Sequence, residues 1–243
     1  MKRLYIYHYM TALLFFLFAL AAPVMSETLP QWFIPLRDAV YSEDFSSEEI
    51  IPLYYAAVEK SSALSSEDRF LMLSRCENMM GLAYRSEGKN DRAAAHYAEG
   101  ILFAERATEI LPGADAYLLL AENISQSCAV RSTSYAIANG LKVEQYAKKA
   151  LSFNNRNAAA QYLIAARWVF APSPFNNYRK GIEMMTAILT EADNDKDDLF
   201  RVYSAIGYAY VQQKKYADAR PWLLRSLEVY PTNKFAQGLL AKS

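Results

Sequence analysis

Apolar and small residues recur at helical spacing along residues 198–233, where the pattern is clearest. The residues that carry it are Tyr203, Ile206, Gly207, Tyr210, Ala219, Leu223 and Ser226. Positions three, four and seven apart lie on one face of an α-helix. Because the polar stretch 212–215 divides the pattern and Pro231 ends it, these residues predict one helix, a turn and a second helix.

The same arrangement recurs earlier in the chain, each time around a small residue at the point where two helices would cross. These small residues are Gly81, Ala121, Ala165 and Gly207, and a bulky residue follows three positions after each. A small side chain lets two helices approach closely, and bulky neighbours fill the space beside it. We therefore predict helical hairpins at about 66–112, 114–155, 157–192 and 198–231.

The second helix of each hairpin is predicted from the same periodicity. These helices are expected at 90–111, 141–153, 178–190 and 216–229. Asn90 is of a residue type that caps helices, and we expect it to cap the first of them. About ten extra residues near 127–140 are expected to lengthen a helix, and about four at 171–177 to lengthen a loop.

Further helices are predicted on both sides of the hairpins. Residues 27–65 are interpreted as N-terminal capping helices, with 47–61 helical and Ser46 or Ser47 at its start. Residues 234–243 are interpreted as a C-terminal capping helix. An array of hairpins needs such ends because its terminal apolar faces would otherwise be exposed to water.

The segment 198–233 resembles a tetratricopeptide repeat, since its periodic residues and Pro231 occupy the eight signature positions of that family. Only Tyr203 and Ser226 differ from the residue types that the family signature has at their positions. The marker residues lie 40, 44 and 42 positions apart, which is longer than the family's 34, so the three earlier repeats are degenerate. The resemblance covers residues 66–233 and implies an all-α, right-handed superhelix, or α-solenoid, with flanking helices. Its first helices would line a concave groove for a peptide or a partner helix.

The family's groove positions can be carried over to this sequence. The candidate partner-binding residues are Arg75, Asn78, Arg85, Glu122, Gln126, Tyr162, Phe170, Arg201, Tyr208 and Gln212. They do not reproduce the Lys, Asn and Arg clamp with which chaperone-binding members hold a carboxylate. The aromatic members would suit an apolar or extended ligand, with the arginines as anchors. The alternative is that some of these side chains pack against the insertions.

The stretch 170–181 combines a Pro-containing loop with an Asn turn before the next helix. It resembles exported, degenerate-repeat components associated with tripartite ATP-independent periplasmic (TRAP) transporters. That resemblance implies a protein that can trimerise and pair with a periplasmic solute-binding protein, handling small apolar or carboxylated ligands. No Cys follows the apolar run near the N-terminus, which departs from the lipoprotein members.

Residues 1–26 have the pattern of a secretory signal peptide. Lys2 and Arg3 precede an apolar run at 10–22, and small or acceptable residues follow it. An uncleaved anchor is the alternative, but the run is shorter than the ~20 residues that span a bilayer. We therefore expect a periplasmic or secreted protein, with no transmembrane helix after signal cleavage.

Charge and composition narrow the function classes. Lys and Arg together number 26, as do Asp and Glu, so nothing favours a nucleic-acid partner. There are only two His residues, and no phosphate-binding loop, paired-Cys motif or nucleophile elbow is present. These features of the sequence predict a non-catalytic protein without a cofactor or metal. Its expected partner is a protein or peptide, a solute-binding protein included, and a homo-oligomer is an open alternative.

Two short motifs suggest chemistry but fit it poorly. Ser86 and Lys89 have the spacing of acyl-transferring penicillin-binding enzymes, yet they fall in a turn and the companion motifs are missing. The acidic stretch 193–198 resembles a calcium-binding loop, but Asp198 stands where that loop requires a Gly. Ser204 stands where the loop requires a Glu that binds calcium through both carboxylate oxygens. We interpret these acids instead as residues at a helix N-terminus, where the dipole favours them.

His96 and the two cysteines are predicted to be structural. His96 has no Cys, Asp or second His at ligand spacing, so we expect it to be partly buried and hydrogen-bonded. Cys76 and Cys128 lie near opposite ends of neighbouring first helices, which are expected to run parallel. This offset is roughly 18 Å at about 1.5 Å per residue, beyond disulfide reach. Two free, mostly buried thiols are expected.

Overall fold

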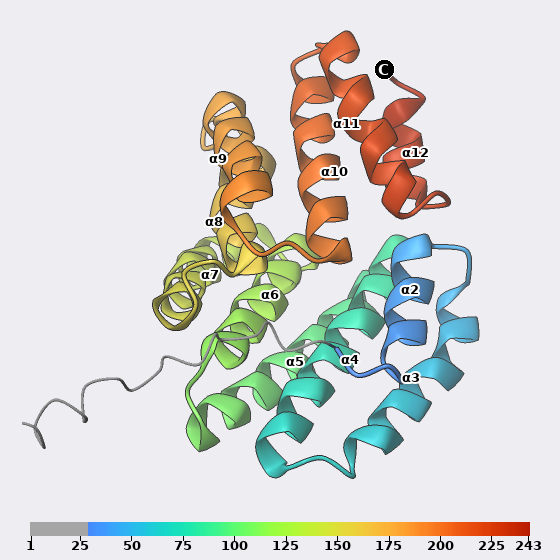
Figure 1. The fold of residues 1–243 in the computed structure, drawn as a ribbon, viewed down its shortest axis with the longest axis vertical. Helices are drawn as coiled ribbons and strands as arrows, with labels where there is room; N and C mark the ends of the chain where they lie inside the picture. The colour runs from blue at the N-terminus through green and yellow to red at the C-terminus, as the bar shows by residue number, and fades with distance from the viewer. Residues whose placement is uncertain (1–28) are drawn as a thin grey trace, which may run out of the picture.

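The computed structural model describes residues 29–243, which fold as an all-helical chain (Figure 1). Within these residues there are eleven helices and no strand. The helices are α2 (Ile34–Ser42), α3 (Ser47–Ser61), α4 (Ser66–Ser86), α5 (Asn90–Ile110), α6 (Ala114–Val130), α7 (Thr133–Phe153), α8 (Ala158–Phe170), α9 (Tyr178–Glu191), α10 (Lys196–Gln212), α11 (Tyr216–Val229) and α12 (Lys234–Leu240). The predicted all-α class is confirmed for the described part of the chain. The predicted signal peptide, residues 1–26, lies outside it.

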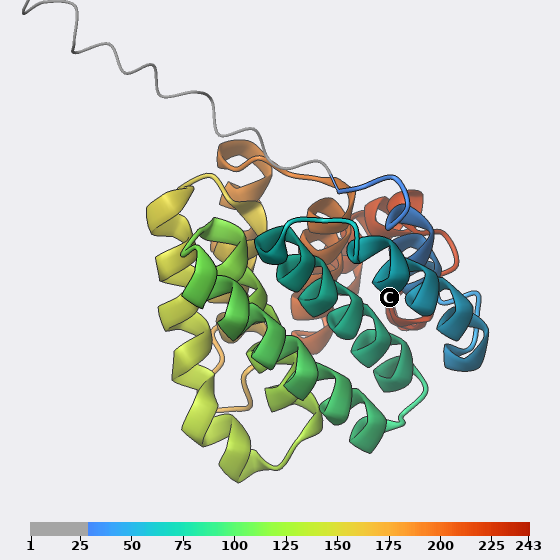
Figure 2. The same cartoon turned by 90° about the horizontal axis from the view of Figure 1, so that it is seen from below.

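Consecutive helices pack as hairpins, pairing α4 with α5, α6 with α7, α8 with α9 and α10 with α11. The first helices also contact one another in sequence, from α4 to α6 to α8 to α10. The second helices pack against the first helices on either side of them, as α5 does against α4 and α6. Seen from below, α4 to α7 lie side by side (Figure 2). The array therefore curves with its first helices on the inside.

The small marker residues lie where neighbouring helices approach most closely. Ala121 and Ala165 are fully buried, and so are Gly81 and Gly207. A Cβ added at Gly81 would overlap the ring of Tyr97, and one at Gly207 would lie 2.5 Å from a methyl carbon of the opposing leucine. The prediction that these positions mark close helix crossings is confirmed.

Helix starts follow the local sequence in most cases. Ser46, one of the two residues that the sequence offered, caps α3 in a reciprocal arrangement with Glu49, and Asn233 caps α12. The cap predicted at Asn90 is wrong. Asn90 is the first residue of α5, and the preceding Lys89 makes no capping side-chain bond.

The insertion near 127–140 lengthens a helix, as expected, but the predicted start of that helix at residue 141 is wrong. The second helix of the hairpin, α7, begins at Thr133 and is capped by Ser132. The eight residues 133–140 add about two turns to its N-terminal end. The insertion at 171–177 forms the loop between α8 and α9 that the sequence predicted.

The two ends of the helical array meet. The ring of Tyr41 on α2 stacks on Tyr230 at 5.2 Å between centroids and meets Phe200 edge-on. The amide of Asn233 donates to the Tyr41 carbonyl at 2.9 Å, and Glu43 accepts a hydrogen bond from the first backbone N–H of α12. Figure 1 shows α2 directly beneath the last hairpin and α12. The N-terminal helix α2 therefore contacts the last hairpin and α12.

Candidate functional site

A pocket of about 410 Å³ lies on the inner side of the array, where α4, α6, α8 and α10 begin. The N-terminal helix α2 forms one side of it through Phe33, Arg37 and Tyr41. Leu71 and Leu118 contribute apolar wall. Every first helix of the array, together with the N-terminal capping region, therefore supplies residues to this one pocket.

Six of the eight carboxylates of the pocket sit at helix starts for a local reason. Acidic residues in the first turn of a helix interact favourably with its dipole and its free N–H groups. Those lining the pocket are Glu67 and Asp68 of α4, Asp115 of α6, and Asp195, Asp197 and Asp198 around the start of α10. Because the first helices run side by side, their N-termini bring these acids together.

Arg201 connects helices on opposite sides of the pocket. Its Nη1 lies 2.6 Å from Oε1 of Glu122 on α6, and its Nη2 lies 2.7 Å from Oδ1 of Asp198. Its guanidinium also sits over the ring of Tyr162, 5.4 Å from the centroid. The Arg201 Nε is fully buried and has no hydrogen-bond partner among the described residues.

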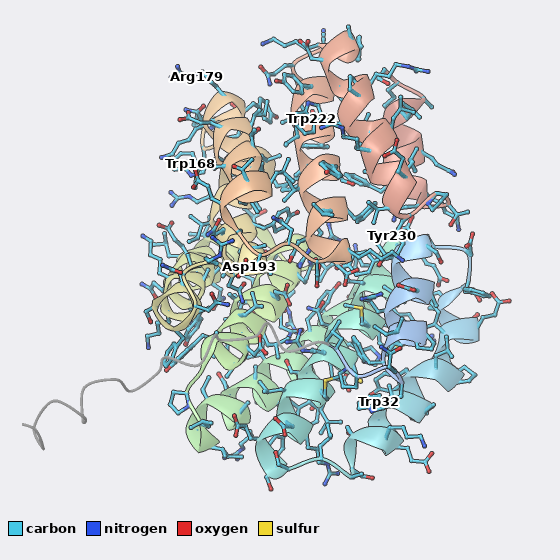
Figure 3. All side chains as sticks on the ribbon, viewed as in Figure 1. Trp32, Trp168, Arg179, Asp193, Trp222 and Tyr230 are labelled. Carbon is cyan, nitrogen blue, oxygen red and sulfur yellow. The ribbon has the colours of Figure 1, made fainter. Side chains whose placement is uncertain are left out.

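Two buried aspartates of α10 have perturbed ionisation. Burial raises the pKa of Asp198 to about 7, and the neighbouring Asp195 adds to the rise while Arg201 opposes it. Burial also raises the pKa of Asp197, again with a contribution from Asp195. The Tyr230 hydroxyl donates to Asp197 at 2.5 Å, and Figure 3 shows Tyr230 where the last hairpin meets α2.

Four of the ten predicted groove residues line this pocket: Arg75, Asn78, Glu122 and Arg201. Arg75 lies 3.3 Å from Asp115, and the Asn78 amide donates to Oδ1 of Asn123 at 3.1 Å. Arg75 and Arg201 are therefore both paired with carboxylates of the chain. That they anchor a ligand stays a prediction.

The other six predicted residues lie apart from the pocket lining, and four of them contact one another in two pairs. Arg85 donates to Gln126 at 2.5 Å, and Phe170 packs on Tyr208 with centroids 5.0 Å apart. Tyr208 also stacks on Phe235 of α12. The remaining two are Tyr162, which lies beneath Arg201, and Gln212, which is exposed at the end of α10. The aromatic members thus pack partly within the array.

Sequence reasoning missed that α2 and the acidic stretch 193–198 line this pocket. No local pattern marks Arg37, which lies 3.6 Å from Asp197, or Tyr41. The stretch 193–198 was noticed for its acids, and it is interpreted correctly as a helix start because Asp195 caps α10. Asp193 instead pairs with Arg156 at 2.8 Å. In the described part of the chain, no three His, Cys, Asp or Glu side chains converge as they would around a metal ion.

The remaining candidate motifs have structural partners. Ser86 donates to a backbone carbonyl of its own helix, whereas Lys89 pairs with Glu48 and Glu87, so the two do not act together. His96 lies 2.6 Å from the buried carboxylate of Glu77, which confirms the prediction of a partly buried, hydrogen-bonded side chain.

Both cysteines are free thiols. Cys76 is fully buried, and burial raises its pKa to about 12. Cys128 is only partly buried, and burial raises its pKa as well. A thiol whose pKa is raised forms little thiolate at neutral pH, so neither cysteine is activated as a nucleophile.

In comparisons with known proteins, no family model and no curated protein sequence matches this chain. None of the described helices is both long enough and apolar enough to span a lipid bilayer.

Proposed function

We propose that this chain is an exported, non-catalytic adaptor of the tetratricopeptide type, whose helices form a superhelical scaffold that binds a partner protein on its inner face. The observation that carries the proposal is the convergence of four predicted groove residues on one pocket on the inner side of the helical array. Its volume of about 410 Å³ is within the range of ligand sites, roughly 300–1,000 Å³. Charged and apolar groups line it together, as a specific binding site requires.

The shape of the inner face indicates how much of a partner would enter. The Arg201–Glu122 ion pair links α10 to α6, and the contacts between α2 and the last hairpin close the array. An extended peptide lying along every first helix would have to break these contacts. We therefore propose that the partner inserts a side chain or a short segment, as anchor residues do at protein interfaces.

A second candidate is an accessory component of a TRAP-type solute transporter. The volume of the pocket favours it, because about 410 Å³ suits a small solute. The charge of the pocket bears on which solute that would be. Eight carboxylates and three guanidinium groups line it, so a carboxylated ligand would meet repulsion.

The test compares partner capture by matched arginine variants. Arg75→Gln changes the pocket, whereas Arg92→Gln changes an exposed arginine outside the pocket lining. After cross-linking in the native envelope, we expect the Arg75→Gln chain to lose its partner and the Arg92→Gln chain to retain it. Equal capture by both variants would show that the inner pocket does not bind the partner. A small molecule found by native mass spectrometry in place of a protein would favour the solute candidate.

A further inference from the structure

One end of the last two hairpins carries exposed apolar and basic side chains together. Here the loop 171–177 joins α8 to α9, and the turn 213–215 joins α10 to α11. Figure 1 shows both connections at the same end of the array, and Phe170 at the end of α8 packs on Tyr208 of α10 with ring centroids 5.0 Å apart. We call this surface the outer edge, and its members are Phe175, Arg179, Lys180, Lys214, Lys215 and Tyr216.

The loop holds Phe175 outside the core. The backbone N–H of Phe175 donates to the Pro172 carbonyl at 2.8 Å, and that of Asn177 donates to the Trp168 carbonyl at 2.8 Å. The Phe175 side chain is 68% exposed. A single exposed apolar side chain is ordinary on a protein surface. Tyr216 is 43% exposed at the same end, however, so the apolar surface here extends over both connections.

The basic residues of the outer edge are not explained by the helices that carry them. Arg179 and Lys180 occupy the first turn of α9, where the helix dipole disfavours cations. Lys214 has a φ of 59°, in the left-handed region that favours glycine. All four cations are exposed, and none has a carboxylate within ion-pair distance among the described residues.

An aromatic side chain accompanies two of these cations. The ammonium of Lys180 lies 3.8 Å from the centroid of the Trp168 ring, and Figure 3 shows Trp168 and Arg179 on the same side of the α8–α9 hairpin. Tryptophan and tyrosine are enriched where proteins meet the boundary between lipid and water, because one end of the ring is apolar and the other polar. The outer edge combines such rings with a basic charge.

The charge of this surface is local. The whole chain has 26 basic and 26 acidic residues, so it has no net attraction for an anionic partner. At the outer edge, four unpaired cations stand beside two exposed carboxylates, Glu183 and Asp218. None of its members lines the inner pocket. A projecting apolar ring surrounded by cations fits a surface that is negative outside and apolar beneath, and an anionic lipid bilayer has both properties.

We propose that the outer edge docks on an anionic lipid bilayer. Phe175 enters the boundary between headgroups and acyl chains, while Arg179, Lys180, Lys214 and Lys215 contact the lipid phosphates. Docking uses a surface separate from the inner pocket, so its failure would leave the adaptor proposal unaffected.

The test is co-sedimentation with vesicles. The chain used is residues 27–243, because it keeps every described helix and omits the apolar run at 10–22, whose own lipid binding would mask the effect. We expect it to sediment with vesicles of equal parts phosphatidylglycerol and phosphatidylcholine, and to release from them as salt is added. Equal binding to phosphatidylcholine alone, or no binding to the anionic vesicles, would overturn the proposal. Capture of an acidic protein through the outer edge without vesicle binding would overturn it too.

One pair of variants tests the apolar contact. Phe175→Ala should weaken vesicle binding about tenfold, because the lost ring no longer leaves water. Phe45→Ala is the matched control, since Phe45 is 51% exposed in the loop between α2 and α3 and follows two acidic residues. Its binding should equal that of the unaltered chain. Equal weakening by both changes would show that Phe175 does not enter the bilayer.

A second pair tests the charge. Arg179→Gln combined with Lys180→Gln should weaken binding about 30-fold, at roughly fivefold for each basic residue beside the lipid. Lys60→Gln combined with Arg106→Gln removes the same charge from exposed positions on α3 and α5 and should have no effect. All these positions are exposed, and circular dichroism checks that each variant folds. Equal loss in the two double variants would assign binding to net charge and refute the outer edge.

Discussion

Replacing Tyr230 by Phe removes one hydroxyl group at the point where the two ends of the array meet. Tyr230 is 3% exposed, and its hydroxyl donates to Asp197 at 2.5 Å, with Asp38 a second acceptor at 3.3 Å. The aromatic ring stays in place in the variant, so its stacking on Tyr41 is retained. The substitution therefore isolates the hydrogen bond from the packing.

The expected loss follows from the burial of the acceptor. Asp197 is 7% exposed, and without Tyr230 its remaining close partner among the described residues is Arg37 at 3.6 Å. A hydrogen bond to a charged group contributes about 1.5–3 kcal/mol, and leaving a buried group unpaired costs a similar amount. We expect the free energy of unfolding to fall by about 2 kcal/mol. At roughly 2–4 °C per kcal/mol for a chain of this size, the Tm should fall by about 4–8 °C.

The measurement is urea denaturation followed by circular dichroism and by the fluorescence of the three tryptophans. Tyr216→Phe is the matched control, because Tyr216 is 43% exposed and its hydroxyl has no hydrogen bond among the described residues. Its stability should stay within about 0.5 kcal/mol of the unaltered chain. If Tyr230→Phe is equally neutral, the contact between the ends does not contribute to stability as the geometry implies.

Three further outcomes are expected. Gly81→Ala should lower the free energy of unfolding by about 1–3 kcal/mol because the new methyl overlaps a buried tyrosine ring, whereas Gly238→Ala, with open space around it, should be neutral or stabilising in thermal melts. Burial raises the pKa of Asp198 from 3.8 to about 7, so the protonated form is favoured in the folded state. Its contribution to stability is complete below about pH 4 and is lost as the pH rises from about 4 to 7. Asp198→Asn should flatten that decline in denaturation series between pH 4 and 7, and an unchanged slope would contradict the assignment. Under native conditions a thiol reagent should label Cys128 faster than Cys76, and equal rates would contradict the burial of Cys76.

Most helix positions followed from residues close together in the sequence. Ser46 and Glu49 cap α3 from within one turn, and the helix ends at residue 61 as predicted. The close helix crossings at Gly81 and Gly207 could also be predicted from the sequence, because each joins two consecutive helices that only a short loop separates. Such signals depend on residues close together in the sequence, so they do not require knowledge of how the rest of the chain folds.

The errors occurred where the local signal was ambiguous or absent. Asparagine is suited equally to the cap of a helix or to its first turn, and Asn90 lies in the first turn of α5. The N-terminal part of α7 carries Ile137 and Leu141, which are 76% and 63% exposed. With these large apolar side chains facing water, the period of buried residues that marks a helix is missing there.

The hairpin order and the all-helical class were thus encoded in spacing along the chain, whereas the composition of the pocket arose only on folding. Glu122 and Arg201 are 79 residues apart, and Asp38 and Tyr230 are 192 apart. Their meeting depends on how α2, the hairpins and α12 pack against one another. No residue spacing along the chain records that packing, so the contact between the two ends and the charge of the pocket belong to the tertiary structure alone.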